Sequence, residues 1–341
     1  MRRHLLLLEK LRARRASHCW RDSISSSTTV RCKHSVAVQL DYYLSPQFGG
    51  VAAALVNDTY AKKGIVINFL PICPVGEEMK RVRHYQNEHK NSVAMGTVEQ
   101  NIFIPTLYKD KRLDISGAAA MFNSSPLCIA SITDQSNTIG ATIGAHEDTV
   151  DLLKRIFPQQ NIIATPRATK VTDLLSGKVD AIQAYLTTEV LKLRRELPEF
   201  PVVVPLEGIS PANAKLGYGQ VIFSTNETLE CEVERKDIVR AFLEATFEGW
   251  QAVIDSPRDG VKMVEEAKKM VQLDEENNDH WQEEDEFKLE MLQQCNDLVN
   301  ETKIGGRLGV IVPDRWDKAT EWLLNDKKAE KEFGLNPFIW S

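Results

Sequence analysis

Short apolar runs alternate with amphipathic segments along the chain between residues 34 and 125. Ser35–Leu40 alternates apolar and polar residues, as a half-buried strand does. Val51–Lys62 is rich in alanine and is followed by Gly64, a residue typical of a helix C-terminus. Further strands are expected at Ile65–Leu70, Ser92–Met95 and Ile115–Phe122, and helices at Met79–Lys90 and Val98–Tyr108, the last broken by Pro105. This alternation predicts an α/β fold in which helices cover a parallel or mixed sheet.

A second α/β unit follows within the same chain, over about residues 126–224. Its predicted elements are Leu127–Ile132, Ile139–Ile143, Thr149–Ile156, Asn161–Ala164, Lys170–Leu175, Ala181–Tyr185, Thr187–Leu197, Val202–Pro205 and Tyr218–Ser224. From residue 225 onward the apolar spacing is mainly helical. The pattern predicts one lobe of residues 34–125 plus 225–341 and another of residues 126–224, joined by crossings at Ser124–Leu127 and Phe223–Asn226. Lobes that share a double linker hinge about a cleft, where ligands prefer to bind.

The first 33 residues differ from the rest in charge. They hold nine basic and two acidic residues, a net charge of +7, whereas the whole chain of 341 residues carries −6. The segment is rich in serine from Ser23 to Thr29, and its apolar run Leu5–Leu8 is too short for a secretory signal. This composition predicts a transit peptide for the mitochondrion, with the plastid as an alternative. The other interpretation is a disordered basic leader that is never removed, in a cytoplasmic protein.

The composition excludes several classes of protein. Hydrophobic residues make up 43% and charged residues 26%, as in globular proteins, and the sequence has no apolar stretch long enough for a transmembrane helix. The negative net charge argues against a nucleic-acid binder. The six cysteines form no C-x-x-C pair, and the motifs of nucleophilic catalysis and of nucleotide binding are absent from the sequence. The sequence therefore predicts neither a metal site nor a cofactor, and it leaves the oligomeric state open.

Candidate ligand-binding residues follow from the rule that ligands of open α/β sheets lie beyond the carboxyl ends of the strands. The residues after four predicted strands are Asp41, Tyr42, Gln47 and Phe48, then Thr97 and Glu99, then His146 and Glu147, and finally Tyr185 with Glu189. Aromatic rings stack on a flat ring and carboxylates accept its N–H groups, so this set favours a nitrogen-rich heteroaromatic ligand. Each residue taken singly is equally explained by turn formation or by packing at a strand end.

The loop His146-Glu147-Asp148 has two compatible interpretations. Its acidic residues precede a predicted helix, where they complement the helix dipole and where Asp148 can cap the first turn. Alternatively, the amides of that helix N-terminus bind a phosphate or carboxylate group of the ligand.

The segment LDYYLSPQFGGV at Leu40–Val51 resembles the opening of the thiamine pyrimidine synthase and SsuA-like family, whose pattern is roughly L-[DN]-W-x-x-x-P-x-H. The resemblance continues in order through AKKGIVINFLP, SVAMG, SGKVDA with Glu189, YGQVIFSTN and GVIVPDRWDKATEWL, and covers roughly residues 36–325. It implies the two-lobed periplasmic-binding-protein fold of type II, with a double-stranded hinge. Members of the family bind small ligands such as pyrimidines and sulfonates, or make the thiamine pyrimidine.

Three departures from the synthase pattern bear on activity. The family's tryptophan falls on Tyr42, which still offers a stacking ring, whereas the histidine that the synthase consumes alongside pyridoxal phosphate falls on Phe48, whose ring has no nitrogen. The cysteine-rich iron segment is replaced by Gly217-Tyr218-Gly219-Gln220. The resemblance therefore implies a binding protein for a heteroaromatic, thiamine-precursor-like metabolite rather than an enzyme.

Two alternatives to the binding protein remain. The first is a divergent enzyme of thiamine-pyrimidine synthesis, in which pyridoxal phosphate and iron would be the cofactors and His146 would replace the missing histidine. The second is an organellar interaction protein that keeps only the fold and presents the acidic segment Asp274–Glu286 and the tryptophan-bearing C-terminus as its surface.

Overall fold

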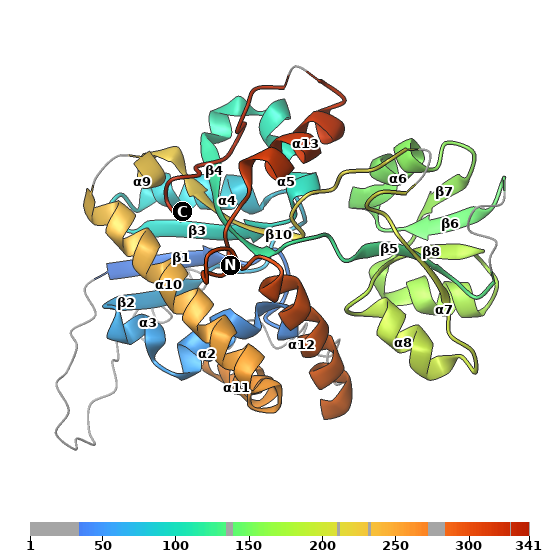
Figure 1. Ribbon diagram of the computed structural model, residues 1–341, viewed down its shortest axis with the longest axis horizontal. Helices are drawn as coiled ribbons and strands as arrows, with labels where there is room; N and C mark the ends of the chain where they lie inside the picture. Colours follow the sequence, from blue (N-terminus) through green and yellow to red (C-terminus); the bar gives the residue numbers. More distant parts are fainter. Residues whose placement is uncertain are drawn as a thin grey trace, which may run out of the picture. The chain divides into compact units, whose positions relative to one another are not determined.

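The computed structural model describes residues 34–133, 139–209, 212–230, 233–271, 284–327 and 329–340. The basic leader and most of the acidic segment Asp274–Glu286 lie outside these residues. Over the described ranges the chain forms two five-stranded mixed sheets, each with helices packed on it (Figure 1). The α/β class expected from the sequence is thereby confirmed.

The first sheet has the strand order β2-β1-β3-β10-β4. Strand β1 (His34–Gln39) pairs in parallel with β2 (Ile65–Phe69) and with β3 (Val93–Val98). Strand β10 (Gln220–Thr225) is antiparallel to both of its neighbours, β3 and β4 (Ile115–Phe122). Because β1, β2 and β3 run in one direction, their carboxyl ends meet at the same edge of the sheet, where the loop after β1 and the loop after β3 were predicted to bind ligand.

Helices cover both faces of this sheet, and successive residues of β1 alternate between two cores. Val36 and Val38 join one core and Ala37 joins the other. The first core packs against α2 (Gly49–Val56), α3 (Thr59–Lys62), α10 (Val233–Asp255), α11 (Pro257–Val271) and α12 (Asp285–Asn300). The opposite core packs against α4 (Glu78–Glu88), α5 (Gln100–Lys109) and α13 (Pro313–Leu324), which lie above the sheet in Figure 1. The short α9 (Asn226–Glu230) follows β10 directly.

Helices α2 and α10 approach each other very closely because glycines face each other at the contact. A Cβ atom placed on Gly249 of α10 would lie 2.0 Å from the carbonyl oxygen of Gly50 in α2. A Cβ atom on Gly50 would in turn lie 2.2 Å from the ring of Trp250, a fully buried side chain. Any side chain larger than hydrogen would separate the two helices.

The second sheet has the strand order β7-β6-β8-β5-β9. Strand β6 (Thr142–Ala145) is parallel to β7 (Asn161–Ala164) and to β8 (Ala181–Tyr185). Strand β5 (Leu127–Ser131) is antiparallel to β8 and to β9 (Val202–Pro205). The carboxyl ends of β6, β7 and β8 therefore share one edge, as the corresponding strands of the first sheet do.

Two cores flank the second sheet as well. One includes Leu153 and Ile156 of α6 (Val150–Ile156), and the other includes residues of α7 (Lys170–Leu175) and α8 (Glu189–Glu196). Short 3-10 turns at Glu147–Thr149 and Arg167–Thr169 precede α6 and α7. Each of these turns follows a parallel strand after one or two residues, so it lies at the edge where candidate residues were expected.

Two expectations about the chain path are wrong. The strand expected to close the inserted unit, Tyr218–Ser224, is β10 of the first sheet, so the return crossing precedes residue 220 instead of lying at Phe223–Asn226. Hydrogen bonding to β3 and β4 decides this placement, and such long-range pairing leaves no local signal. Pro105 does not break its helix, because α5 runs through it from Gln100 to Lys109. The division of the chain into two hinged lobes stays a prediction.

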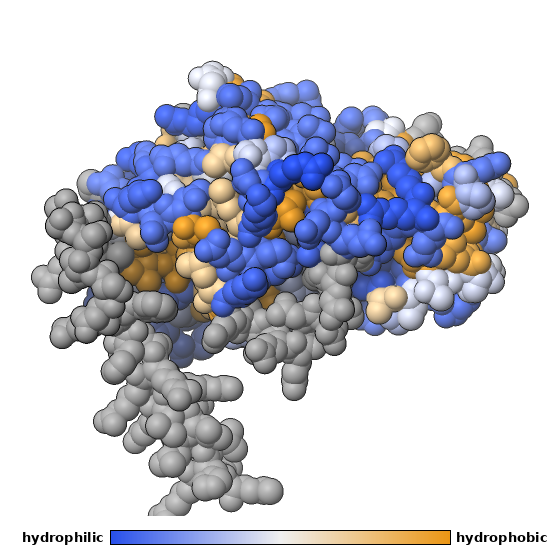
Figure 2. Space-filling view, turned by 90° about the horizontal axis from the view of Figure 1, so that it is seen from below, coloured by the Kyte–Doolittle hydropathy of each residue, from blue (hydrophilic) through white to orange (hydrophobic). Residues whose placement is uncertain are grey.

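Figure 2 shows a face on which hydrophilic residues predominate and hydrophobic areas are interspersed. None of the described helices is long and apolar enough to cross a membrane.

Candidate functional site

Five loops that follow parallel strands bring polar and aromatic side chains of the two sheets together. The loop after β1 carries Asp41 and Tyr42, and Glu99 directly follows β3. In the second sheet, Arg167 follows β7 and Tyr185 ends β8. Two contacts join these loops across the two sheets, a hydrogen bond from Tyr185 to Glu99 and a cation–π contact from Arg167 to Tyr42. The rule that ligands lie beyond strand carboxyl ends thus identifies residues that are neighbours in the fold.

Asp41 lies at the centre of a hydrogen-bond network within the first sheet. Its Oδ1 accepts hydrogen bonds from Thr97 Oγ1 at 2.7 Å and from Gln220 Nε2 at 2.5 Å. Gln47 Nε2 donates to Gln220 Oε1 at 2.7 Å and completes the network. Burial raises the pKa of Asp41, although these hydrogen bonds act in the opposite direction. The structure therefore brings three predicted residues together.

Gln220 belongs to this network but escaped the sequence analysis. It is the first residue of β10, an antiparallel strand, so the rule about carboxyl ends does not select it. Gln220 lies in the segment Gly217-Tyr218-Gly219-Gln220, which lacks the cysteines of the synthase, and in YGQVIFSTN of the family resemblance, but neither pattern assigns it a ligand-binding role.

Glu99 forms the hydrogen bond that joins the two sheets at the site. Its Oε1 accepts a hydrogen bond of 2.7 Å from the hydroxyl of Tyr185, and Ser125 Oγ lies 3.4 Å from its Oε2. The residue is only 7% exposed. Burial raises the pKa of Glu99 to about 8, since the charged form loses water; the hydrogen bond from Tyr185 opposes this shift and the charge of Asp41 adds to it.

Tyr42 faces a cation from the second sheet. The guanidinium carbon of Arg167 lies 5.6 Å from the centre of the Tyr42 ring, and Tyr43 packs edge-on against Tyr42 with ring centres 5.2 Å apart. Arg167 also donates to Asp148 Oδ2 at 3.2 Å. The arrangement combines a cation–π contact with an ion pair.

In the loop after β6, Asp148 pairs with basic side chains and does not cap the helix, while the binding of an anion by the helix amides stays a prediction. His146 Nδ1 lies 2.9 Å from Asp148 Oδ1, so Asp148 is held between His146 and Arg167. Burial acts to raise the pKa of Asp148, but His146 and Arg167 outweigh it and the pKa is lowered. No side-chain cap hydrogen bond is present at the start of the 3-10 turn or of α6. Glu147 is solvent-exposed.

Glu189, a predicted acceptor for ligand N–H groups, is engaged by the protein itself. Its Oε1 pairs with Lys170 Nζ at 2.8 Å, and its Oε2 accepts from Thr188 Oγ1 and from the backbone N–H of Tyr185. Burial acts to raise its pKa, but Lys170 and these hydrogen bonds outweigh it and lower the pKa of Glu189 to about 2. Glu189 thereby fixes the end of β8, on which Tyr185 lies.

Lys170 was not predicted, and it is almost completely buried at 1% exposure. Its ammonium reaches the carbonyl oxygen of Gln183 at 2.9 Å and the side-chain Oε1 of Gln183 at 3.3 Å, besides Glu189. Its three N–H donors thus have three acceptors. A lysine at the start of a helix gives no local signal that it is buried.

Phe48, the position of the synthase histidine in the resemblance, is fully buried in the first core. It ends the 3-10 turn Pro46–Phe48, which enters α2. The structure does not bring it to the Asp41 or Glu99 networks, and its ring packs as a core residue.

The synthase alternative requires iron, and an iron site would need metal-ligating side chains close together in the described ranges. No group of three histidine, cysteine, aspartate or glutamate side chains there could hold a metal ion. The buried Lys170 is surrounded by acceptors. His146, offered as a substitute for the synthase histidine, is engaged with Asp148.

Glu78 adds a further buried carboxyl group that the sequence did not reveal. It begins α4, has no exposed surface, and accepts one hydrogen bond of 2.7 Å from the N–H of Gly76. Its Oε1 is buried without a hydrogen-bond partner in the described structure. Burial, and then the charge of Asp41, raise the pKa of Glu78 to about 8. We call Asp41, Glu78, Glu99 and Asp148 the carboxyl cluster.

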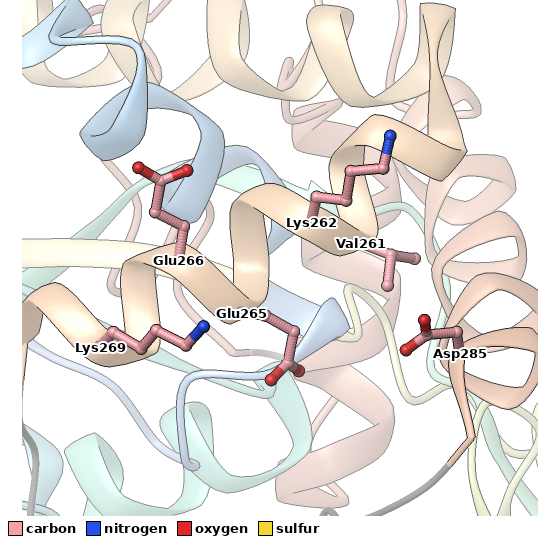
Figure 3. A pocket seen from close by; sticks show the side chains of 6 residues that line it. All are labelled: Val261, Lys262, Glu265, Glu266, Lys269 and Asp285. Carbon is pink, nitrogen blue, oxygen red and sulfur yellow. The ribbon is translucent and has the colours of Figure 1, made fainter.

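A pocket of about 390 Å³ lies elsewhere, on helices α11 and α12 (Figure 3). It is lined by Val261, Lys262, Glu265, Glu266, Lys269 and Asp285. Its charges have both signs and no aromatic ring lines it. None of the predicted ligand-binding residues belongs to it, so it does not share the chemistry of the strand-end loops.

Comparison with known proteins gives a family and a fold. The family model described as NMT1/THI5 like matches residues 45–260, which is more than half of the chain. No curated protein matches the chain.

Solved structures align over most of the chain. The periplasmic aliphatic sulphonate binding protein SsuA from Escherichia coli has a TM-score of 0.58 at 10% identity, over 88% of this chain and 95% of that one. The alkanesulfonate-binding protein SsuA from Xanthomonas axonopodis, bound to MOPS, has a TM-score of 0.51 at 8% identity, over 86% and 91%. A Candida albicans protein with the generic periplasmic binding protein fold has a TM-score of 0.53 at 11% identity, over 89% and 96%. The family resemblance and the expected fold are thereby confirmed.

Proposed function

Because the chain belongs to the NMT1/THI5-like family, we propose that it is a small-molecule binding protein whose ligand is a nitrogen-bearing heteroaromatic metabolite resembling a thiamine precursor. The observation that carries the proposal is the gathering of aromatic and carboxyl groups at the strand ends of both sheets. Tyr42 and Tyr185 offer rings, and Asp41 and Glu99 offer acceptors. Rings stack on a flat ligand while carboxyl groups accept its N–H groups, which fixes its orientation.

The site has a physical route to ligand binding. Glu99 belongs to the first sheet and Tyr185 to the second, so their hydrogen bond holds the two sets of loops together. A ligand N–H group that takes over an oxygen of Glu99 exchanges this internal hydrogen bond for one to the ligand. The buried position of Glu99 makes an unreplaced hydrogen bond costly, which favours a ligand that carries a donor.

Binding of an aminopyrimidine tests the proposal. We expect hydroxymethylpyrimidine, the pyrimidine alcohol of thiamine, to bind in a calorimetric titration, and Tyr42→Ala to weaken binding roughly 10- to 100-fold through lost stacking. Tyr42→Phe keeps the ring and should bind nearly as well. The matched control is Tyr108→Ala, at an exposed tyrosine of α5.

Two results decide against this function. The first is the absence of binding together with the absence of any heteroaromatic molecule in the mass spectrum of the natively purified protein. The second is binding that Tyr42→Ala leaves unchanged, which would place the ligand elsewhere.

The organellar setting is proposed on the leader alone. Nine basic residues against two acidic ones, with a serine-rich stretch, are typical of a mitochondrial transit peptide. A fusion of residues 1–34 to a fluorescent reporter should enter mitochondria. Plastid import of the fusion would support the alternative compartment, and a diffuse cytosolic signal would exclude the transit peptide.

A further inference from the structure

Carboxyl groups outnumber basic side chains at the candidate site. The carboxyl cluster of Asp41, Glu78, Glu99 and Asp148 comes from four different loops, and these groups affect one another electrostatically: Asp41 acts on Glu78 and Glu99, and Asp148 acts on both as well. The buried Lys170 is already paired with Glu189. Arg167 acts on both Asp41 and Asp148, and His146 acts on Asp148 as well. Because burial raises the pKa of Glu78 and of Glu99 to about 8, both groups hold a proton at neutral pH. An added positive charge favours their ionised form and is stabilised by it, whereas an added negative charge is opposed.

Arg167 itself occupies this environment as a ligand of that kind would. Its guanidinium is planar, rich in N–H groups and positively charged. It lies over the ring of Tyr42, with 5.6 Å between the guanidinium carbon and the ring centre, and pairs with Asp148 at 3.2 Å. Arg167 also interacts electrostatically with Tyr185 and Glu189 of the second sheet, so residues of both sheets stabilise its charge. The contacts that hold this guanidinium are the ones that suit a protonated amino-heterocycle.

We propose that the ligand is a cation, a heteroaromatic ring that carries a protonated amine, and that Arg167 competes with it for Tyr42 and Asp148. This inference rests on the proposed function and specifies the charge of the ligand. It sets the protein apart from the two SsuA proteins above, which are named as sulfonate-binding proteins, because sulfonates are anions. The opposite assignment, in which Arg167 binds an anionic group of the ligand, is tested in the same experiment.

Three probes that differ only in charge measure the preference. Aminomethylpyrimidine is a cation at neutral pH, hydroxymethylpyrimidine is neutral, and hydroxymethylpyrimidine phosphate is an anion, while all three share one ring. We expect the cation to bind at least about tenfold more tightly than the neutral alcohol, and the phosphate to bind more weakly than both. Arg167→Ala should strengthen binding of the cation, and Glu99→Gln should weaken it. Glu88→Gln, at an exposed glutamate of α4, is the matched control.

The outcomes separate the two claims. If the phosphate binds most tightly and Arg167→Ala abolishes its binding, Arg167 is an anion anchor and the inference is wrong, while the proposed function stands. Equal affinities for all three probes also overturn the inference. Failure of all three probes to bind overturns the inference, and it overturns the proposed function as well if the natively purified protein also releases no heteroaromatic molecule.

Discussion

The hydroxyl of Tyr185, at the end of β8 in the second sheet, donates a hydrogen bond of 2.7 Å to the carboxyl group of Glu99, the residue that follows β3 in the first sheet. The two residues are 86 positions apart in the sequence, and both are predicted to lie at ligand-binding strand ends. The sheets also meet where Leu191 of α8 packs with Phe287 and Met291 of α12. The two sheets are thus joined by a polar contact between loops and by an apolar contact between helices.

Removing the Tyr185 hydroxyl should destabilise the ligand-free protein. Tyr185→Phe leaves the buried Glu99 with only the long contact to Ser125, so we expect the free energy of unfolding to fall by about 1–3 kcal/mol. Urea unfolding measures the change. Tyr108→Phe, at an exposed site, is the control and should change stability by less than about 0.5 kcal/mol. Equal effects of the two substitutions would show that the hydrogen bond does not contribute.

Stability should decrease as the pH rises from about 4.5 to about 8. Burial raises the pKa of Glu99 and of Glu78 from 4.5 to about 8, so between these values the folded protein holds protons that the unfolded chain has lost. The stabilisation is complete below pH 4.5 and is lost as the pH rises through 8, with a slope of at most about 1.4 kcal/mol per pH unit for each group.

Chemical denaturation of the protein and of Glu99→Gln over this pH range measures that dependence. The variant should lose the contribution of Glu99 and keep that of Glu78, so its slope should be smaller. Glu88→Gln, which is exposed, should reproduce the original slope. Identical slopes for the protein and for Glu99→Gln would contradict the raised pKa.

Glu189→Gln should be strongly destabilising, because it leaves the charge of Lys170 buried without a counter-ion. We expect a loss of about 3–5 kcal/mol. The double variant Lys170→Met with Glu189→Leu removes both charges and should recover much of this loss, which thermal melts at pH 7 will show. Since the pKa of Glu189 is lowered to about 2, its stabilising effect is present above pH 4.5 and is lost as the pH falls through 2. Full stability of Glu189→Gln would instead favour a surface role in ligand binding.

Gly249→Ala should destabilise the contact between α2 and α10. The new Cβ atom would lie 2.0 Å from the Gly50 carbonyl oxygen, a backbone atom that moves only with its helix. We expect a loss of about 1–3 kcal/mol despite the better helix propensity of alanine. Arg240→Ala, at an exposed position of the same helix, is the control. A variant as stable as the parent protein would show that the two helices separate without penalty.

The alternation of apolar and polar residues predicted most strands and helices, because each element buries one side against a sheet or a helix. The same pattern, together with the rule about strand ends, selected Asp41, Gln47 and Thr97, which share one hydrogen-bond network in the structure. It also selected Glu99 and Tyr185, which are hydrogen-bonded to each other. These results depend on the direction of neighbouring strands, which short connections make predictable.

Other parts of the site depend on contacts that no local pattern records. Gln220 reaches Asp41 across 179 residues, from a strand whose place between β3 and β4 is decided by pairing. Lys170 can be buried because Gln183 of β8 supplies hydrogen-bond acceptors. Glu78 is buried because other elements enclose it. Phe48 shows the converse case: its place in a motif favoured a site role, whereas the end of its 3-10 turn puts it in the core.

The position of β10 has a consequence for how the protein is synthesised. A ribosome delivers β1, β2, β3 and β4 well before β10, the strand that must lie between β3 and β4. The strands of the second sheet are contiguous in sequence, from Leu127 to Pro205, so this sheet can complete its hydrogen bonding while the first still has a gap between β3 and β4. The nascent chain thus exposes the unpaired edges of β3 and β4 until residue 225 has emerged, and aggregation or chaperone capture at that stage would concentrate on these two edges.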